Sequence, residues 1–417
     1  MSKSPRKQVA LIGCGGNVGG FCVDFLGRLE EVGRVWLCDP QLYEKKNLRT
    51  QNILRRDVGH RKAIVQAERL KQINPNIEVD SCIDSIEAVP LGLLSDVDII
   101  LSAVDSRRAR QVINEIARRL DVPLLDCGVD GHKLIARVSV YFPGRDDCCA
   151  ECRWGAEQYR NIETIYPCAP DVGAPAATNS TAQLGALAAS LMVIECQKVL
   201  NGATRYDGSG YEVLMEADYH NLYPARLNYN PECRLPEHRS GSIKPPDGFE
   251  TRSINTTLGE LLRGESAGEQ PGCSKSGRTG GSTDSGKETA DDHRPTVPSD
   301  RAMRLQVVGN RFVTHLTCGE CGHRRAYVKL RASLKNDGTY KCDRCGGEMF
   351  AAGFDTLDEL DSTRLSAPTA SRSLRSVGIR DGDVIRLRRS GSEPRYVVTL
   401  NGTQTARTKR SSERRPR

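Results

Sequence analysis

Short apolar runs and longer stretches with helical spacing alternate along the first 145 residues of the chain. The apolar runs, which are typical of buried strands, cover residues 8–12, 34–40, 77–83, 96–105, 122–131 and 134–143. Between them, apolar residues recur at helical spacing over 21–33, 58–75 and 107–121. This order predicts an α/β fold with a doubly wound, mostly parallel sheet of the Rossmann type.

Three further elements are expected after this region. Residues 179–200 are apolar on nearly every side of a helix, which predicts a long buried helix. Residues 210–218 and 221–230 have the pattern of two late strands.

The composition changes sharply at residue 264. Residues 264–300 contain seven Gly, six Ser and three Pro and no aromatic residue, so they cannot bury a core. We therefore expect a disordered linker over 264–302, followed by a small β-rich domain over 303–400. Residues 256–262 fit the same domain, which would make the linker an insertion.

Charge and hydropathy argue against two classes of protein, those that bind nucleic acid and those that span a membrane. The formal net charge is +7, but the last thirteen residues alone carry six Lys or Arg against one Glu. We interpret 401–417 as a basic disordered tail and do not expect nucleic-acid binding. No run of 18 apolar residues is present and the start lacks a signal-peptide pattern, so we expect no membrane span and a cytoplasmic location.

Sixteen cysteines in such a chain favour metal and thiol chemistry over disulfides. Two CxxCG motifs, at Cys318/Cys321 and Cys342/Cys345, stand twenty residues apart. Four thiolates at this spacing can converge tetrahedrally, which predicts a zinc ribbon. Six cysteines stand singly in apolar runs and are expected to be small buried residues: Cys14, Cys22, Cys38, Cys82, Cys127 and Cys196.

A glycine-rich turn separates the first predicted strand from the first predicted helix. Glycines at this position let a backbone approach phosphates, although they also serve simply to pack a helix on a strand. Asp39 ends the next strand, where a carboxylate can accept bonds from ribose hydroxyls. The pattern predicts a nucleotide site, with these candidate ligands: Gly13, Gly15, Gly16 and Asp39.

A glycine-rich turn followed by an acidic residue would first suggest a nicotinamide-dependent dehydrogenase. The residues after Asp39 argue against that class of enzyme. Asn47 and Gln51 form a polar cluster, and Lys62 follows in the run Val58-Gly-His-Arg-Lys-Ala63. With Asp105 after a later strand and Arg110 five residues on, residues 8 to about 240 resemble the E1-like adenylating family (ThiF, MoeB, HesA and the adenylation domains of ubiquitin-activating enzymes). The resemblance implies that residues 1–245 form an ATP-binding adenylation domain.

The chain departs from the family pattern at two positions. Val18 occupies the last glycine position of the turn, and Gly19 follows it. Thr50 stands where the family has an arginine that touches the triphosphate, while Arg49 lies one place earlier.

The resemblance implies ATP-dependent adenylation of the C-terminal carboxylate of a ubiquitin-like or sulfur-carrier protein, by a homodimer. Lys62 and Arg49 would neutralise the triphosphate, Asp105 would hold Mg²⁺, and Asn47 and Gln51 would line the nucleotide site. Two alternatives stay open: a modifier of a peptide or tRNA, and a non-catalytic scaffold that binds a ubiquitin-like partner.

The resemblance also implies a second zinc site and a reactive thiol. Cys149 and Cys152 form a CxxC pair, and Asn-Pro-Glu-Cys233 supplies a third thiol where the family has a second CxxC. His238 is the fourth candidate ligand, and Cys148 is a rival. Cys168, between two prolines, occupies the place of the family cysteine that carries a thioester or persulfide in some members.

A short stretch of the C-terminal region has a resemblance of its own. Residues 373–389 resemble the late part of a β-grasp, ubiquitin-like fold. This part of the chain would more plausibly recruit a partner than be conjugated to one, because it does not end in Gly-Gly.

Overall fold

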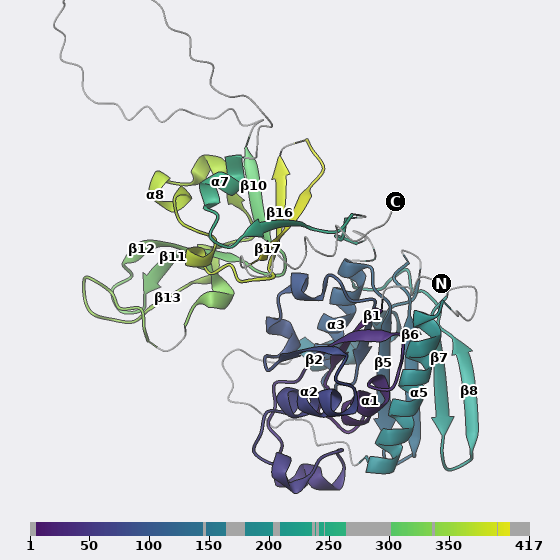
Figure 1. Cartoon of the computed structure of the whole chain (residues 1–417). Coiled ribbons are helices and arrows are strands. Elements are labelled where there is room, and N and C mark those ends of the chain that lie inside the picture. Colours follow the sequence, from purple (N-terminus) through teal and green to yellow (C-terminus); the bar gives the residue numbers. More distant parts are fainter. Residues whose placement is uncertain are drawn as a thin grey trace, which may run out of the picture. The chain divides into compact units, whose positions relative to one another are not determined.

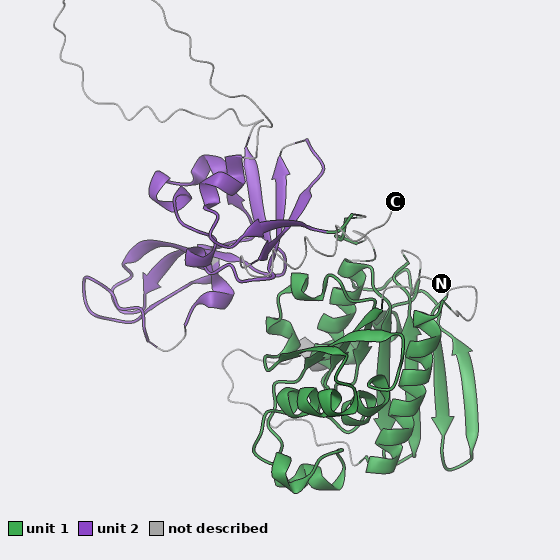
Figure 2. Ribbon diagram, in the orientation of Figure 1, with its two compact units in different colours: residues 1–248 green, residues 249–417 purple. Residues whose placement is uncertain are grey.

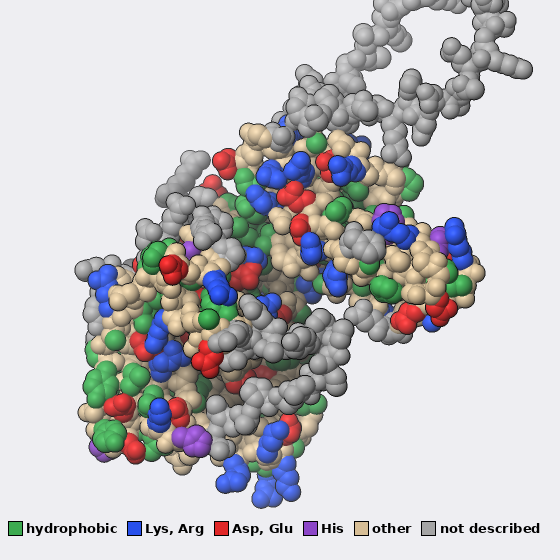
Figure 3. All heavy atoms as spheres, turned by 180° about the vertical axis from the view of Figure 1, so that it is seen from behind, with side chains coloured by type: hydrophobic (Ala, Val, Ile, Leu, Met, Phe, Trp, Pro, Cys, Tyr) green, Lys and Arg blue, Asp and Glu red, His purple; other side chains and the backbone are tan. Residues whose placement is uncertain are grey.

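The chain forms two compact units, residues 1–248 and 249–417, which are described separately (Figure 2). The computed structural model describes residues 6–144, 147–163, 180–202, 209–235, 238, 242–245, 247–263, 302–335, 338–389 and 391–400. The predicted linker therefore lies outside the described residues except for Ala302, and the basic tail lies outside them entirely. On the face seen in Figure 3, acidic and basic side chains are interspersed over both units.

The first unit is built on one eight-stranded sheet with the order β3-β2-β1-β4-β5-β6-β7-β8. Its first five strands are parallel and its last three are added antiparallel, which confirms the predicted mostly parallel α/β fold. The strands are β1 (Lys7–Ile12), β2 (Val32–Cys38), β3 (Glu78–Cys82), β4 (Ile99–Ser102), β5 (Leu124–Asp130), β6 (Ile135–Tyr141), β7 (Tyr211–Glu216) and β8 (Asn221–Arg226).

Helices cover this sheet on both sides (Figure 1). They are α1 (Gly19–Leu26), α2 (Lys62–Ile73), α3 (Arg107–Leu120), α4 (Ala156–Glu163) and α5 (Ala182–Leu200). The chain runs from β1 outward to β3 and then from β4 outward to β5 in the opposite direction. Because such crossovers are right-handed, α1 and α2 lie on one face and α3 on the other. α5 packs against α1, β5 and β6, so it shares the face of α1.

The predicted helix 179–200 is α5, but only one of its faces is buried. Leu184, Ala188, Met192 and Cys196 are buried at i, i+4 spacing, whereas Ile194 is 49% exposed. The prediction of burial on all sides was therefore wrong, because α5 has the sheet on one side only. Among the described helices, α5 alone has the length and hydropathy that a membrane span requires, but its packing is that of a core helix.

The second unit is β-rich, as predicted. One five-stranded sheet has the order β15-β10-β16-β17-β9, and a smaller sheet joins β12, β11 and β13, with β14 also on β11. Its strands are β9 (Glu250–Ser253), β10 (Met303–Val307), β11 (Phe312–Cys318), β12 (Arg324–Leu330), β13 (Met349–Phe350), β14 (Thr356–Leu357), β15 (Leu360–Asp361), β16 (Val384–Arg389) and β17 (Arg395–Leu400). Two short helices accompany them, α7 (Leu258–Arg263) and α8 (Ala367–Ala370). Leu258, Leu261 and Leu262 of α7 lie in the core of this unit, so the segment before the linker packs with the segment after it.

Candidate active site and metal centres

A cavity of about 1120 Å³ opens at the carboxyl ends of the parallel strands. Its walls come from the turn after β1, the end of β2, the 3₁₀-helix η1 (Lys45–Arg49), the segments after β3 and β4, the second half of β5, the first half of β6, and the starts of α2, α3 and α5. Eight of the predicted nucleotide-site and catalytic residues meet there: Gly13, Gly16, Asp39, Asn47, Arg49, Gln51, Lys62 and Asp105.

The glycines of the first turn are needed because other groups lie very close to them. Gly13 has φ +81°, and a Cβ on it would lie 2.6 Å from the carbonyl oxygen of Ala103. A Cβ on Gly19 would overlap the carbonyl oxygen of Gly13. Gly15 is not among the described lining residues; a Cβ there would overlap the side chain of Lys62. Gly15 thus contributes to the site by making room for Lys62.

The two departures from the family pattern are both compatible with this geometry. Val18 has φ −81° and ψ −49°, a conformation open to any L-residue, so the position does not require glycine. Arg49 and Thr50 both line the cavity at the end of η1. A guanidinium is therefore part of the cavity wall despite its shift by one residue.

Asp39 and Lys62 are two buried ionisable side chains at the cavity wall. Backbone N–H groups of Gly15 and Gln41 each donate to the Asp39 carboxylate at 3.0 Å. Burial raises the pKa of Asp39, and the nearby Lys62 ammonium opposes that rise. The Lys62 ammonium donates to Gln41 Oε1 at 2.8 Å and lies 5.5 Å from the ring centre of Tyr43. Both side chains are thus held in place by the folded chain itself.

Asn47 and Gln51 differ in how their amides are used. Asn47 Oδ1 accepts a hydrogen bond from the backbone of Glu44 at 2.7 Å, which closes the turn of η1. The buried Gln51 Oε1 has no hydrogen-bond partner among the described residues. A buried acceptor without a donor is rare in folded proteins, and at a cavity it is available to a ligand.

Four of the described helices begin at the cavity, since its lining includes Lys62, the first residue of α2, and the N-cap residues of α1, α3 and α5, which are Val18, Ser106 and Thr181. The hydroxyls of Ser106 and Thr181 each accept a backbone hydrogen bond at 3.3 Å, so both act as N-caps. A helix N-terminus carries a partial positive charge and favours anions. Together with Lys62 and Arg49, these termini make the cavity suited to a polyanion.

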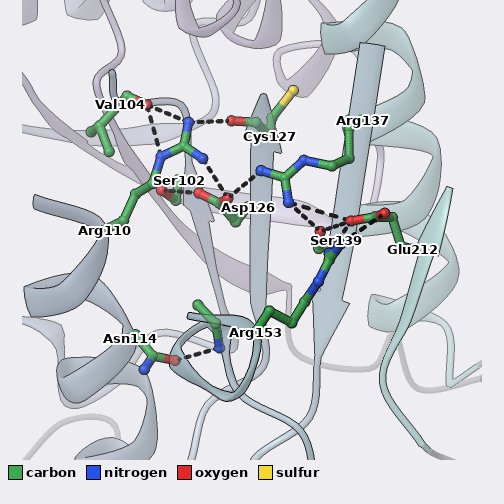
Figure 4. A network of polar contacts seen from close by, with 11 residues as sticks. Ser102, Val104, Arg110, Asn114, Asp126, Cys127, Arg137, Ser139, Arg153 and Glu212 are labelled. Atoms are coloured by element: carbon green, nitrogen blue, oxygen red, sulfur yellow. Dashed lines mark hydrogen bonds and ion pairs between the residues drawn. The ribbon is translucent and has the colours of Figure 1, made fainter. Parts of the chain in front are cut away.

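Asp105 lies at the start of α3, exposed on the cavity wall. Arg110, one turn into α3, donates to the carbonyl oxygens of Val104 at 2.8 Å and Cys127 at 3.0 Å. Its guanidinium also donates to the buried Asp126 at 2.9 Å (Figure 4). Arg110 therefore ties the loop that carries Asp105 to the middle of β5.

The ion-pair network continues from Asp126 across β6 and β7. Arg137 contacts Asp126 and Glu212 at 3.3 Å each, and Arg153 also pairs with Glu212 (Figure 4). Arg137 lines the cavity. Sequence reasoning missed these residues, because single polar positions inside strands do not show which partners a sheet will bring beside them.

The predicted metal ligands of the first unit come together. The candidate donor atoms of Cys149, Cys152, Cys233 and His238 all lie within 4.8 Å of one another, and the four residues are buried. Cys149 Sγ lies 3.8 Å from the sulfurs of Cys152 and Cys233. Zinc–sulfur bonds of about 2.3 Å at tetrahedral angles separate sulfurs by roughly 3.8 Å, so the cluster fits zinc. Cys148 lies outside this described cluster and donates to the carbonyl of Cys149 instead.

The four cysteines of the second unit also converge. The sulfurs of Cys318, Cys321, Cys342 and Cys345 lie within 4.8 Å of one another. The Cys318–Cys345 and Cys321–Cys342 separations are 3.5 and 3.7 Å. This set likewise fits a tetrahedral zinc centre. Cys168, by contrast, lies outside the described residues.

Comparison with known proteins identifies the family. The model of the ThiF family matches residues 1–235, more than half of the chain, so the chain belongs to the ThiF family. Ubiquitin-like modifier-activating enzyme 5 of Aedes aegypti is 27% identical over 242 residues, which are 55% of this chain and 58% of that protein. The sulfur carrier protein adenylyltransferase of Thermus thermophilus is 27% identical over 237 residues, 55% of this chain and 81% of that protein.

The structure of Escherichia coli MccB with ATP covers 55% of this chain and 65% of its own, with a TM-score of 0.43 and 22% sequence identity. The chain spans between about an eighth and three fifths of the length of the first curated relatives that it matches.

Proposed function

We propose that the first unit adenylates the C-terminal carboxylate of a ubiquitin-like or sulfur-carrier protein, consuming ATP and releasing pyrophosphate. The observation that carries this proposal is the cavity, where Lys62, Arg49 and four helix N-termini face one space beside the buried Asp39. Membership of the ThiF family, and relatives named as modifier-activating enzymes and sulfur-carrier adenylyltransferases, support it.

Each part of the nucleotide has a matching wall of the cavity. Asp39 would accept the ribose hydroxyls, and the turn around Gly13 and Gly16 would lie against the phosphates. Lys62 and Arg49 would offset negative charge that moves onto pyrophosphate as the acyl–phosphate bond forms. Asn47 and Gln51 would complete the nucleotide side of the cavity.

Asp105 is the carboxylate that would hold Mg²⁺, whose charge would further offset that of the triphosphate. Its exposure on the cavity wall suits an oxygen ligand that shares the ion with phosphates and water. Arg110 keeps the Asp105 loop in register with β5 through the hydrogen bonds described above.

The cavity also has room for a second substrate. Its volume exceeds the usual range of about 300–1,000 Å³ for small-molecule sites. The lining continues from the nucleotide side along β5 and β6, through Gly128, Asp130 and Arg137. A flexible C-terminal tail entering along these strands would bring its carboxylate to the α-phosphate, and a homodimer would carry two such sites.

Pyrophosphate exchange into ATP, measured with candidate carrier proteins, tests the proposal. Asp105→Ala should abolish carrier-dependent exchange, because the triphosphate loses its metal ligand, while the thermal unfolding temperature stays unchanged. Asp96→Ala, an exposed aspartate away from the cavity, is the matched control and should exchange normally. Normal exchange by Asp105→Ala would refute its role. No exchange by the wild-type chain with any carrier would favour the scaffold alternative.

We further propose that the acyl group passes from the adenylate to the thiol of Cys168. Because adenylation precedes transfer, Cys168→Ala should retain pyrophosphate exchange but lose a carrier adduct that thiols cleave. Gel electrophoresis without reductant measures the adduct. An adduct that persists in Cys168→Ala would exclude this cysteine as the acceptor.

A further inference from the structure

Two cysteines expected to be inert core residues lie next to each other beside the cavity. Cys38 is the last residue of β2 and Cys82 the last residue of β3, and the two are register partners in the parallel sheet. Cys38 is buried and lines the cavity, whereas Cys82 is partly exposed, so the prediction that Cys82 is a buried residue was wrong. The sequence hides this pair, because 43 residues separate the two cysteines.

The geometry of the pair is compatible with a disulfide. Adjacent strands lie about 4.8 Å apart, within the range of about 4.4–6.8 Å that a disulfide spans between Cα atoms. Register partners also point to the same face of the sheet. The Cys38 thiol donates a hydrogen bond to the carbonyl of Asp84, two residues beyond Cys82, at 3.3 Å, which holds the Cys38 side chain against the chain just after β3.

We propose that Cys38 and Cys82 form a dithiol modification site, which reacts with low-molecular-weight disulfides and closes to an intramolecular Cys38–Cys82 disulfide. The partly exposed Cys82 would be the attacking thiol and the buried Cys38 the resolving thiol.

Cys82 should react before Cys38, as this assignment requires. The neighbouring Cys38 thiol lowers the pKa of Cys82, which favours its thiolate form. The same contact, together with burial, raises the pKa of Cys38. Cys82 is therefore both the more accessible thiol and the one that is more readily deprotonated.

The reaction proceeds in two thiol–disulfide exchanges. The Cys82 thiolate attacks one sulfur of the small disulfide, whose S–S bond breaks, and one small thiolate leaves and takes up a proton. Cys38 then loses its proton and attacks the Cys82 sulfur of the mixed disulfide, which releases the second small thiol. Two electrons pass from the cysteine pair to the small disulfide, which ends as two thiols.

Closing the disulfide would disturb the nucleotide side of the cavity. The carbonyl of Cys38 accepts backbone hydrogen bonds from Gly13 at 2.8 Å and Cys14 at 3.3 Å. The backbone of Asp39 donates to the carbonyl of Cys82 at 3.1 Å. A Cα separation of about 4.8 Å is near the short end of the disulfide range, whose most common values are about 5.5–6 Å, so closure would push apart the strand ends that hold the glycine-rich turn and Asp39. Affinity for ATP, which rests on the proposed function, should fall on the order of tenfold or more.

Peptide mapping of the zinc-loaded full chain tests the site without reference to nucleotide. Trypsin releases Cys38 in residues 35–45 and Cys82 in residues 72–107, each with no other cysteine. After equilibration in buffers of oxidised and reduced glutathione, mass spectrometry should find these two peptides joined, and dithiothreitol should separate them. Absence of the joined peptide at every ratio would overturn the proposal.

Two variants distinguish the roles of the thiols. Cys38→Ala should accumulate a mixed disulfide of glutathione on Cys82, because the resolving thiol is missing. Cys82→Ser should form neither species, and its ATP affinity, measured calorimetrically, should not respond to oxidised glutathione. Glutathione found on Cys38 in the Cys82→Ser variant would overturn the assigned order of attack.

The nucleotide measurement separates the two proposals. A reduced chain that binds ATP and an oxidised chain that binds it more weakly support the inference. Equal affinities for ATP with the Cys38–Cys82 disulfide present would overturn the coupling of the site to the cavity. A reduced chain that binds no ATP would instead refute the proposed function, while the peptide map would still test the dithiol.

Discussion

Asp39 and Lys62 are 5% and 4% exposed, yet both are ionisable and both line the cavity. Burial alone would disfavour the charged form of Asp39. Two backbone donors on the Asp39 carboxylate, and Gln41 on the Lys62 ammonium, replace part of the lost water. Charge is thus fixed in position before any ligand arrives, which is the arrangement that electrostatic stabilisation of a transition state requires.

A pH dependence of ATP affinity follows from the environment of Asp39. Burial raises its pKa above the ordinary 3.8, and only the ionised carboxylate accepts two ribose hydroxyls. Affinity should therefore fall as pH decreases through this raised pKa, a loss that starts at a higher pH than for an exposed aspartate. Asp39→Asn should bind about tenfold more weakly at pH 7, as expected for a loss of about 1.4 kcal/mol.

Calorimetric titration of both proteins from pH 7.5 downward measures this dependence. Protonation of ATP itself affects both proteins equally, so it cancels in the ratio of wild-type to Asp39→Asn affinity. The ratio should shrink toward one at low pH, because the Asp39 carboxyl is then neutral like the Asn side chain. A constant ratio would mean that Asp39 does not titrate in this range or does not meet the nucleotide.

At the scale of the element, the two adjacent glycines at the start of α1, Gly19 and Gly20, differ in how much room they have for a side chain. A Cβ on Gly19 would overlap the carbonyl oxygen of Gly13, which is backbone and cannot move aside cheaply. A Cβ on Gly20 would have its nearest neighbours, the side chains of Asn52 and Gln66, at 3.6 Å, which is ordinary contact. The two positions therefore make a matched pair.

Gly19→Ala should destabilise the first unit by roughly 1–3 kcal/mol, because the clash forces the turn apart. It should also weaken ATP binding, since Gly13 and Gly16 move with the turn. Gly20→Ala should be neutral or stabilise by about 0.4–1 kcal/mol through the entropy of the unfolded chain. Chemical denaturation with ATP titration checks both variants. Equal stabilities would contradict the close packing of the turn.

Elements were easier to predict from the sequence than the contacts between them. The alternation of apolar runs and helical spacing was sufficient to predict the mostly parallel sheet. Local boundaries were less accurate: the helix expected over 21–33 is α1, which ends at Leu26, because Gly27 caps it and β2 already begins at Val32. Motifs with short spacing identified the cysteines of the second unit, where a few residues fix the geometry.

Partners far apart in sequence could not be predicted. The Arg137–Glu212 pair joins residues 75 apart, and Arg118 lies 2.7 Å from His238 across 120 residues. Such pairs depend on strand order and register, which a single sequence does not specify. The Cys38–Cys82 pair escaped prediction for the same reason.

At the scale of the molecule, each unit has its own cluster of candidate zinc ligands, three thiols and an imidazole in the first unit and four thiols in the second. In the first unit, the cluster joins the loop after β6 to the segment after β8, because Cys149 and Cys152 precede Cys233 and His238 by more than 80 residues. In the second unit, Cys318 ends β11 and the other three cysteines lie in the neighbouring turns. A metal in each cluster would therefore add a cross-link between separate segments of the chain.

We predict two zinc ions per chain, one in each cluster. Cys149→Ser should reduce the zinc content to one ion, because three donors do not complete a tetrahedral structural site. Cys342→Ser should do the same independently, and the double variant should retain no zinc. Elemental analysis of purified protein, expressed per chain, measures all three.

The adjacent cysteine supplies the control for the first site. Cys148 is buried like Cys149, but its thiol donates to a backbone carbonyl and does not join the described cluster. Cys148→Ser should therefore keep two zinc ions, although it removes a thiol from the same loop. If Cys148→Ser lost one ion and Cys149→Ser lost none, Cys148 would be the ligand. The wild-type chain could instead hold one zinc ion that Cys342→Ser loses and Cys149→Ser keeps. In that case the zinc centre would be the ribbon of the second unit. The close packing of the Cys149 cluster would then have to come from hydrogen bonds such as that from Asn114 to the Cys149 sulfur, at 3.5 Å.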